Sequence, residues 1–190
     1  MKILSYISLK GGAGKTMSCL ATASSQARAG HIVAVLDLDP QASARAWART
    51  AEFPFPVFSP AQAAQTPPGT EWLLVDTPPN SLPILKDTAE TSDYIVVPLN
   101  AGAQEIDRLR PTMDEIGSTR LKEGCVIGVL PTRIPNSAER KLMPEVLEEL
   151  GYNAIGLVPE KVDYFRSFGR LFTSDLEEPY AQALRALGVL

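Results

Sequence analysis

The stretch Lys10-Gly11-Gly12-Ala13-Gly14-Lys15-Thr16 decides which fold this sequence predicts. An apolar, β-prone run over residues 2–8 precedes it, and helix-forming residues over 15–29 follow it as far as Gly30. Glycine lets backbone N–H groups turn inward around an anion, and the amino end of a helix adds the positive end of its dipole. Because the motif and its strand–helix setting agree, the stretch indicates a phosphate-binding loop and not a chance glycine turn.

The side chains of the loop match the chemistry of a nucleoside triphosphate. Lys15 can reach the β- and γ-phosphates, and the Thr16 hydroxyl can ligate Mg²⁺. The backbone from Lys10 through Gly11, Gly12, Ala13 and Gly14 can cradle the phosphate oxygens.

Beyond the loop, apolar runs alternate with helical patterns. This alternation predicts an α/β fold, a mostly parallel twisted sheet with helices on both faces, formed by one domain over residues 1–190. The proline-rich residues 53–70 predict a loop-rich insert with a short strand at 57–58, and Pro111 predicts a kink or break in its helix. The other strands are expected at 31–36, 72–75, 94–97, 125–130 and 152–158, and the other helices at 41–51, 81–91, 103–118, 137–150, 162–168 and 177–187.

Polar side chains follow several of these strands and should meet the loop at one sheet edge. Ligands of parallel sheets bind beyond the carboxyl ends of the strands, where Asp37, Asp39, Asp76 and Asn100 are expected. Asp76 is a candidate to hold Mg²⁺ through a water. If the strand continues past Asp37, the carboxylates of Asp37 and Asp39 point the same way; alternatively, one of them caps the following helix.

The composition narrows the classes of function. With 45% hydrophobic and 21% charged residues, the chain can bury a core. The net charge of −4 argues against tight nucleic-acid binding through bulk charge, although a local basic patch remains compatible. No run approaches the 18 apolar residues of a membrane span, and two cysteines form no disulfide framework, so we expect reduced thiols in a cytoplasmic protein. We assign no catalysis to His31, the one histidine.

One departure from the ordinary loop pattern points to a family. Leu9 stands where G-x-x-x-x-G-K-[ST] has its first glycine, and Lys10 adds a second lysine. This combination resembles the deviant Walker A loop, K-G-G-x-G-K-[ST], of the ParA/MinD ATPases, which have a P-loop NTPase fold. Residues 37–41 resemble the D-x-D-P-Q segment of that family, and residues 73–79 resemble its Walker B strand and turn; 96–99 and 157–160 match weaker positions.

The resemblance implies an ATPase that uses ATP and Mg²⁺. It makes Asp39 the residue that orients or polarises the attacking water, and it gives Asp37 an assisting place in the Mg²⁺ shell beside Thr16 and Asp76. It also implies that Lys10 reaches the nucleotide of a second subunit, in an ATP-dependent homodimer with two ATP molecules at the interface. The alternative is a surface lysine that acts within its own subunit.

The resemblance extends to the base of the nucleotide. It places Thr132, Arg133, Pro159 and Glu160 as candidate base contacts, with ordinary loop residues as the alternative for each pair. Met17 stands where many members have a second threonine, so one contact to the α-phosphate is expected to be missing.

Because the first strand is expected from residue 2, we expect no helix-turn-helix extension before it, which by resemblance fits the small ParA subgroup. Such a protein would bind non-specific DNA when loaded with ATP, respond to a ParB-like centromere-binding partner, and segregate a plasmid or a chromosome region. It would be cytoplasmic, associated with the nucleoid where DNA binding holds. Candidate DNA contacts, or simply solvated side chains, are Arg140, Lys141, Lys161, Arg166 and Arg170.

Three other functions are compatible with the loop. A MinD-like positioning ATPase would need a basic amphipathic helix at the end of the chain, but residues 179–190 carry one base, so we expect no membrane binding. An iron–sulfur reductase of the superfamily would need cysteine ligands, which Cys19 and Cys125 are poorly placed to supply, and no second substrate site indicates a ligase. A nucleotide-binding adaptor with negligible hydrolysis is opposed mildly by Asp39.

Overall fold

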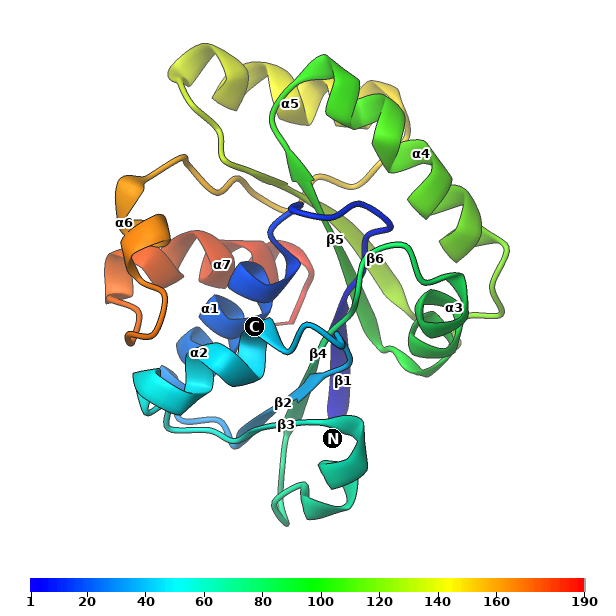
Figure 1. Cartoon of the computed structure of the whole chain (residues 1–190). Coiled ribbons are helices and arrows are strands. Elements are labelled where there is room, and N and C mark those ends of the chain that lie inside the picture. Colours follow the sequence, from blue (N-terminus) through cyan, green and yellow to red (C-terminus); the bar gives the residue numbers. More distant parts are fainter. Residues whose placement is uncertain (190) are drawn as a thin grey trace.

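A twisted parallel sheet lies between two layers of helices (Figure 1). In the computed structural model, which describes residues 1–189, six strands pair in the order β3-β2-β4-β1-β5-β6. Every pairing is parallel, as the apolar runs predict. The strands are β1 (Lys2–Tyr6), β2 (Val33–Asp37), β3 (Val57–Phe58), β4 (Trp72–Asp76), β5 (Tyr94–Asn100) and β6 (Val126–Thr132).

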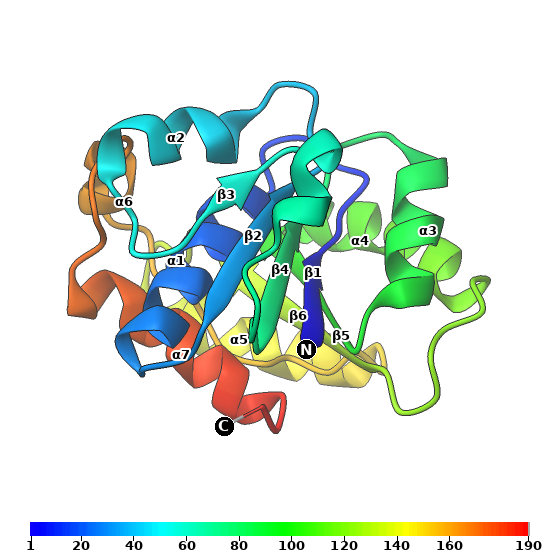
Figure 2. The ribbon, with the colours of Figure 1, turned by 90° about the horizontal axis from the view of Figure 1, so that it is seen from below.

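The central strand β1 lies between β4 and β5. From β1 the chain moves out to β2 and β3, returns to β4, and then crosses to β5 and β6 on the other side of β1. The view from below shows the β3 edge of the sheet beside the 3-10 helix η1 (Pro60–Gln65) (Figure 2). The loop that follows β1 therefore leaves the sheet where the chain changes direction, and ligands bind at such positions in α/β sheets.

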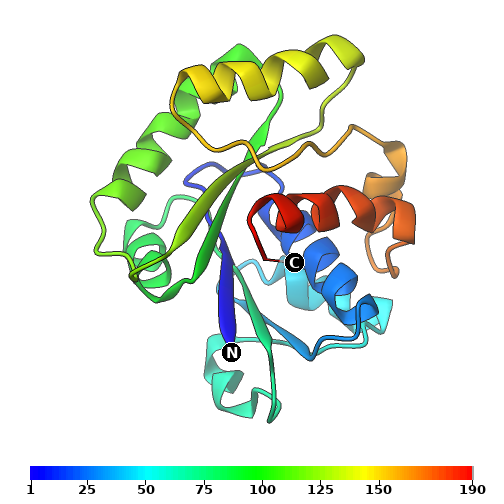
Figure 3. The same cartoon turned by 180° about the vertical axis from the view of Figure 1, so that it is seen from behind.

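Each face of the sheet has its own core. One core includes Leu20 and Tyr180 and joins α1 (Lys15–Arg28), α2 (Ser43–Ala51) and α7 (Ser174–Ala186) to the sheet. The other includes Leu109 and Leu147 and joins α3 (Leu82–Thr91), α4 (Ala103–Gly117) and α5 (Ser137–Glu149). Helices α1 and α7 lie side by side (Figures 1 and 3). The short α6 (Val162–Arg166) lies near one end of α2 (Figure 2), and the residues after it contact Trp47 of α2.

The predicted fold class is confirmed, but the predicted strand at 152–158 is wrong. That segment makes only isolated bridges, from Ala154 to Val129 and from Pro159 to Ile134. Gly156 has a φ of 138°, outside the conformation of a strand, and a Cβ at this position would lie 3.5 Å from the Ala183 Cα in α7. The segment therefore follows β6 without forming a continuous ladder.

Several element boundaries also differ from the expected ones. Helix α4 continues through Pro111, so the break that was one of the two predicted outcomes is not found. Strands β2 and β4 extend by one residue to include Asp37 and Asp76, so both aspartates belong to the sheet itself. Among the described residues, no helix is both long enough and apolar enough to cross a membrane.

An ion pair between the buried Glu177 of α7 and the half-exposed Arg28 of α1 joins the two helices. Glu177 is 3% exposed and accepts hydrogen bonds from Ser24 Oγ at 2.6 Å and from Arg28 Nε at 2.6 Å. Arg28 Nη2 also donates to the Phe172 carbonyl at 3.2 Å. A buried carboxylate that loses its cation is destabilising, so this pair is a point at which the packing of α7 can be tested.

We expect Arg28→Ala to lower the free energy of unfolding by roughly 1–3 kcal/mol, because it leaves the buried Glu177 carboxylate without its cation. The matched control is Arg185→Ala, which removes an arginine from an exposed pair with Glu178 and should cost about 0.5 kcal/mol or less. Urea unfolding measures both variants. Equal losses would show that the Arg28–Glu177 pair adds no more than a surface pair.

Candidate nucleotide-binding site

The loop between β1 and α1 has the backbone of an anion cradle. Gly12 and Gly14 have φ values of 75° and 95°, in the left-handed region that favours glycine. Helix α1 begins at Lys15, with Gly14 at its N-cap and no capping side chain among the described residues. The first N–H groups of α1 are therefore not used by a side-chain cap, and the positive end of the helix dipole faces the loop.

Side chains at the ends of two neighbouring strands form hydrogen bonds with the backbone of this loop. Asn100, at the end of β5, donates from Nδ2 to the Gly12 carbonyl at 3.2 Å. The Thr132 hydroxyl, at the end of β6, lies 3.3 Å from the Ala13 carbonyl and 3.0 Å from Asn100 Oδ1. Thr132, predicted as a base contact, thus touches the loop itself, and Asn100, for which the sequence indicated only a location, supports the loop directly.

Lys15 lies inside the loop and is 6% exposed. Its ammonium donates to the Ser8 carbonyl at 3.0 Å and to the Lys10 carbonyl at 2.9 Å. Burial lowers the pKa of Lys15, and the negative charges of Asp76 and Asp39 act in the opposite direction. The ammonium is thereby held at the floor of the loop, where it can meet phosphate oxygens.

Thr16 and Asp76 form an oxygen pair beside Lys15. The Thr16 hydroxyl donates to Asp76 Oδ2 at 2.7 Å, and Asp76 Oδ1 has no hydrogen-bond partner among the described residues. Burial raises the pKa of Asp76 to about 7, with the hydrogen bond from Thr16 acting against it and Asp37 adding to it. An orphaned carboxylate oxygen next to a hydroxyl fits a hard divalent cation such as Mg²⁺.

Asp37 and Asp39 have different surroundings. Strand β2 ends at Asp37, so the continuing strand that would align the two carboxylates is not found. The buried Asp37 accepts from the Asp39 amide at 3.0 Å and from the Arg45 amide at 3.1 Å, and it pairs with the Arg45 guanidinium at 3.3 Å. The half-buried Asp39 accepts from the Gln41 amide at 2.8 Å. Asp37 therefore anchors the start of α2, and Asp39 lies on the loop ahead of it.

A cavity of about 710 Å³ opens from the helix end of the loop. Gly14 and Met17 line this cavity. Both pairs that the sequence analysis named as candidate base contacts, Thr132–Arg133 and Pro159–Glu160, line it as well. Arg133 has a φ of 53°, a strained conformation for a residue with a side chain. The other residues that line the cavity are mainly aromatic: Ser18, Trp47, Val158, Lys161, Tyr164, Phe165, Phe168 and Tyr180. This volume is typical of a small-molecule site.

Comparison with known families assigns residues 4–171 to the CobQ/CobB/MinD/ParA nucleotide binding domain. The chain belongs to this family. A comparison with curated protein sequences gave no match.

Solved structures share the fold of this CobQ/CobB/MinD/ParA domain. A Borrelia burgdorferi protein assigned to plasmid partition and bound to AMPPNP has a TM-score of 0.79 and 19% identity, with 97% of each chain covered. A complex of ATP with a single-substitution variant of Cyanothece McdA has a TM-score of 0.76 and 17% identity, covering 100% of this chain and 97% of that one. MinD in the Aquifex aeolicus MinC:MinD complex has a TM-score of 0.76 and 14% identity, covering 99% and 96%.

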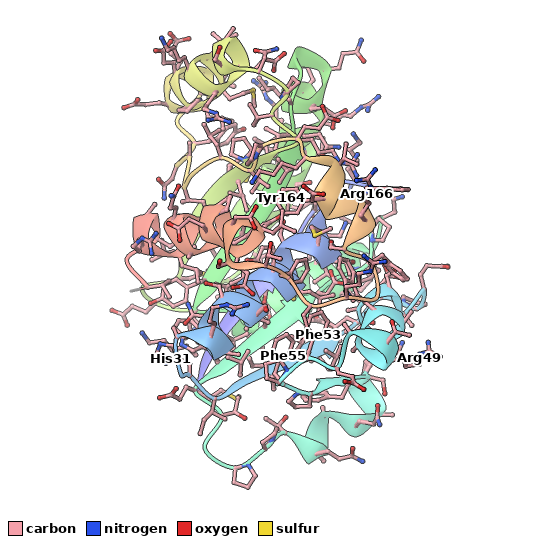
Figure 4. All side chains as sticks on the ribbon, turned by 90° about the vertical axis from the view of Figure 1, so that its left-hand side faces the viewer. His31, Arg49, Phe53, Phe55, Tyr164 and Arg166 are labelled. Carbon is pink, nitrogen blue, oxygen red and sulfur yellow. The ribbon has the colours of Figure 1, made fainter. Side chains whose placement is uncertain are left out.

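The aromatic wall of the cavity was not predicted. Trp47 of α2 donates from Nε1 to the Arg170 carbonyl at 3.0 Å, and its ring centroid lies 5.2 Å from that of Phe168. Tyr164 of α6 is largely buried, whereas Arg166 on the same helix is exposed (Figure 4). These residues come from segments far apart in the chain, so their helical spacing alone indicated only core packing. Phe53 and Phe55 lie beside α2 (Figure 4), and their stacked rings have centroids 4.9 Å apart. His31 lies at the edge of the molecule in the same view and is within contact distance of Glu71.

Lys10 has a partner in its own chain. Its ammonium forms an ion pair with Glu105 in the first turn of α4, and Arg108 Nη1 donates to the same carboxylate at 3.0 Å. Nothing in the spacing of the sequence links residues 95 positions apart. The sequence therefore singled out Lys10 as a candidate to reach the nucleotide of a second subunit, but it did not predict the contact with Glu105.

Asp76→Asn tests the buried carboxylate through stability. A pKa raised from 3.8 to about 7 means that the folded protein holds a proton that the unfolded chain has lost, so stability falls as the pH rises from about 4 to about 7. We expect the nucleotide-free Asn variant to be less sensitive to this rise and more stable than wild type at pH 8, by up to about 1.4 kcal/mol for each pKa unit of the shift. Urea unfolding of both proteins across that pH range, with Mg²⁺ chelated, measures the difference. A difference that does not change with pH would contradict the raised pKa.

Proposed function

We propose that this protein is a ParA-type ATPase that binds ATP with Mg²⁺, dimerises on ATP and hydrolyses it weakly until a partner stimulates it. The observation that carries the proposal is the cavity at Gly14, which joins the phosphate loop to both candidate base-contact pairs. A triphosphate on the loop would thus have its base end in a cavity of suitable size. AMPPNP and ATP bound to proteins of the same fold support the proposal.

Each part of the nucleotide has a candidate partner. The phosphates lie against the backbone of Lys10 to Gly14, with Lys15 at the β- and γ-phosphates. Thr16 and Asp76 would hold Mg²⁺, and Asp37, which is paired in register with Asp76, would add negative charge near the ion. The base enters the cavity against Thr132, Arg133, Pro159 and Glu160, and Met17 offers an apolar contact where a hydroxyl would have met the α-phosphate.

Hydrolysis depends on positioning and charge neutralisation more than on covalent chemistry. Asp39, on the loop after β2, orients and polarises the attacking water. Lys10 of the second subunit brings a cation to the charge that develops on the transferred phosphoryl group. Mg²⁺, when bound, neutralises charge on the phosphate oxygens. This arrangement makes the homodimer the active form.

The proposed biological role is segregation of a plasmid or a chromosome region. The ATP-bound dimer would bind non-specific DNA in the cytoplasm, on the nucleoid, and a ParB-like protein would trigger its release. The assignment of a protein of this fold to plasmid partition supports the role. Because the chain is acidic overall, binding must use a local basic surface, and Arg166 and Arg170 are exposed candidates beside the cavity.

Substitutions in the loop and in Asp39 should separate binding from hydrolysis. Lys15→Ala should abolish ATP binding, since the variant lacks the ammonium that meets the β- and γ-phosphates. Asp39→Ala should keep ATP binding and lower turnover by about 100-fold or more, which leaves an ATP-bound dimer. Calorimetry measures ATP binding, phosphate release measures turnover, and light scattering measures dimer formation. Normal turnover by the Asp39→Ala variant would show that Asp39 has no part in hydrolysis. Normal ATP binding by the Lys15→Ala variant would contradict the assignment of residues 10–16 as the phosphate-binding loop.

DNA binding provides the second test of the role. We expect retention of long non-specific duplex DNA with ATP but not with ADP or without nucleotide, and weaker binding as the salt concentration rises. Arg166→Ala combined with Arg170→Ala should lower this affinity by about tenfold, while Lys86→Ala, a charge change on the far face at α3, should not. Binding that is absent in all three states would leave the ATPase proposal intact and assign the protein a different cargo, such as a protein or a membrane.

A further inference from the structure

The carboxylate of Glu105 pairs with two cations of its own subunit. Glu105 Oε2 pairs with the Lys10 ammonium, and Glu105 Oε1 accepts from Arg108 Nη1 at 3.0 Å. Glu105 is the most enclosed of the three, with 14% of its side chain exposed, against 29% for Lys10 and 57% for Arg108. An enclosed carboxylate needs a cation more than an exposed one does.

Two hydrogen bonds hold the backbone of Lys10 in place. Its amide donates to Ser8 Oγ at 3.2 Å, and its carbonyl accepts from the Lys15 ammonium at 2.9 Å. A long, flexible side chain on a fixed backbone can exchange partners without movement of the loop. The contact with Glu105 is therefore one arrangement of Lys10, and it directs the ammonium toward α4.

We propose that Glu105 is a positioning residue that holds Lys10 within its own subunit, so that Lys10 is withheld from the nucleotide of a second subunit until the two subunits meet. This inference rests on the proposed function, in which Lys10 acts across the dimer. Arg108 has the complementary part, since it stays on Glu105 after Lys10 leaves. The trio thus sets how readily the ATP-bound dimer assembles.

The charges give Glu105 and Arg108 opposite effects on the release of Lys10. With Arg108 present, release of Lys10 leaves a neutral Glu105–Arg108 pair, so the enclosed carboxylate is never alone. Without Arg108, release would leave that carboxylate without a cation, and Lys10 should be held more firmly. Without the charge of Glu105, Lys10 loses its partner and is free for the second subunit.

The first experiment measures the protein concentration at which ATP turnover per subunit is half-maximal. We expect Glu105→Gln to lower this concentration by about fivefold, and Arg108→Gln to raise it by a similar factor, as for a partly exposed ion pair. The affinity of the dilute protein for ATP should be unchanged in both variants, which a general structural defect would not leave intact. Asp107→Asn removes an exposed acidic charge from the same helix and should leave the concentration dependence as in wild type.

The second experiment reports the contact without ATP. In nucleotide-free protein, an amine-reactive reagent followed by peptide mass spectrometry should modify Lys10 several-fold faster in Glu105→Gln than in wild type, with Lys86 as the internal reference. Unchanged Lys10 modification would overturn the proposal, as would an unchanged concentration dependence of turnover in an active variant. Faster modification of Lys10 in a protein that binds no ATP would overturn the proposed function, and with it the regulatory role, while retaining the ion pair.

Discussion

The buried Asp76 carboxylate is the constraint around which the site is organised. It lies at the end of β4, in register with Asp37 at the end of β2, and its one hydrogen bond among the described residues comes from Thr16 in the first turn of α1. Two buried carboxylates at adjacent strand ends are unfavourable unless cations are near. Lys15 and Arg45 supply positive charge from within the chain. In the proposed function, a divalent cation bound with the triphosphate would supply further positive charge beside these two carboxylates.

The phosphate loop obtains its shape from both sides of β1. Thr16 ties it to β4, while Asn100 and Thr132 reach it from β5 and β6. The loop is therefore held by groups from three strands and requires little reorganisation to receive an anion.

Helix α2 joins the two ends of the site. Its start is anchored by Asp37 through the Arg45 amide. Its middle residue Trp47 lines the cavity, packs on Phe168 and donates to the Arg170 carbonyl. The loop that bears Asp39 thus continues into a helix that contacts the segment after α6. The exposed Phe165 in α6 and Phe168 just after it line the cavity and leave apolar surface there, which a ligand would partly cover.

The sequence alone determined the fold class, the phosphate loop and the strand ends at which Asp37 and Asp76 lie. These features are local. Glycines at defined positions, apolar runs and the carboxylates at their ends predict a loop, a strand and a strand end without reference to residues far away in the sequence. Only the tertiary structure decided that Glu105 meets Lys10, that Asn100 and Thr132 brace the loop, and that Trp47, Tyr164 and Phe168 share a cavity with Met17. The segment 152–158 was mistaken for a strand because Gly156 departs from strand geometry where it approaches α7, which an apolar pattern does not record. Such contacts join residues far apart in the chain, and they depend on the order of strands and the packing of helices, which a linear pattern of residue types does not specify.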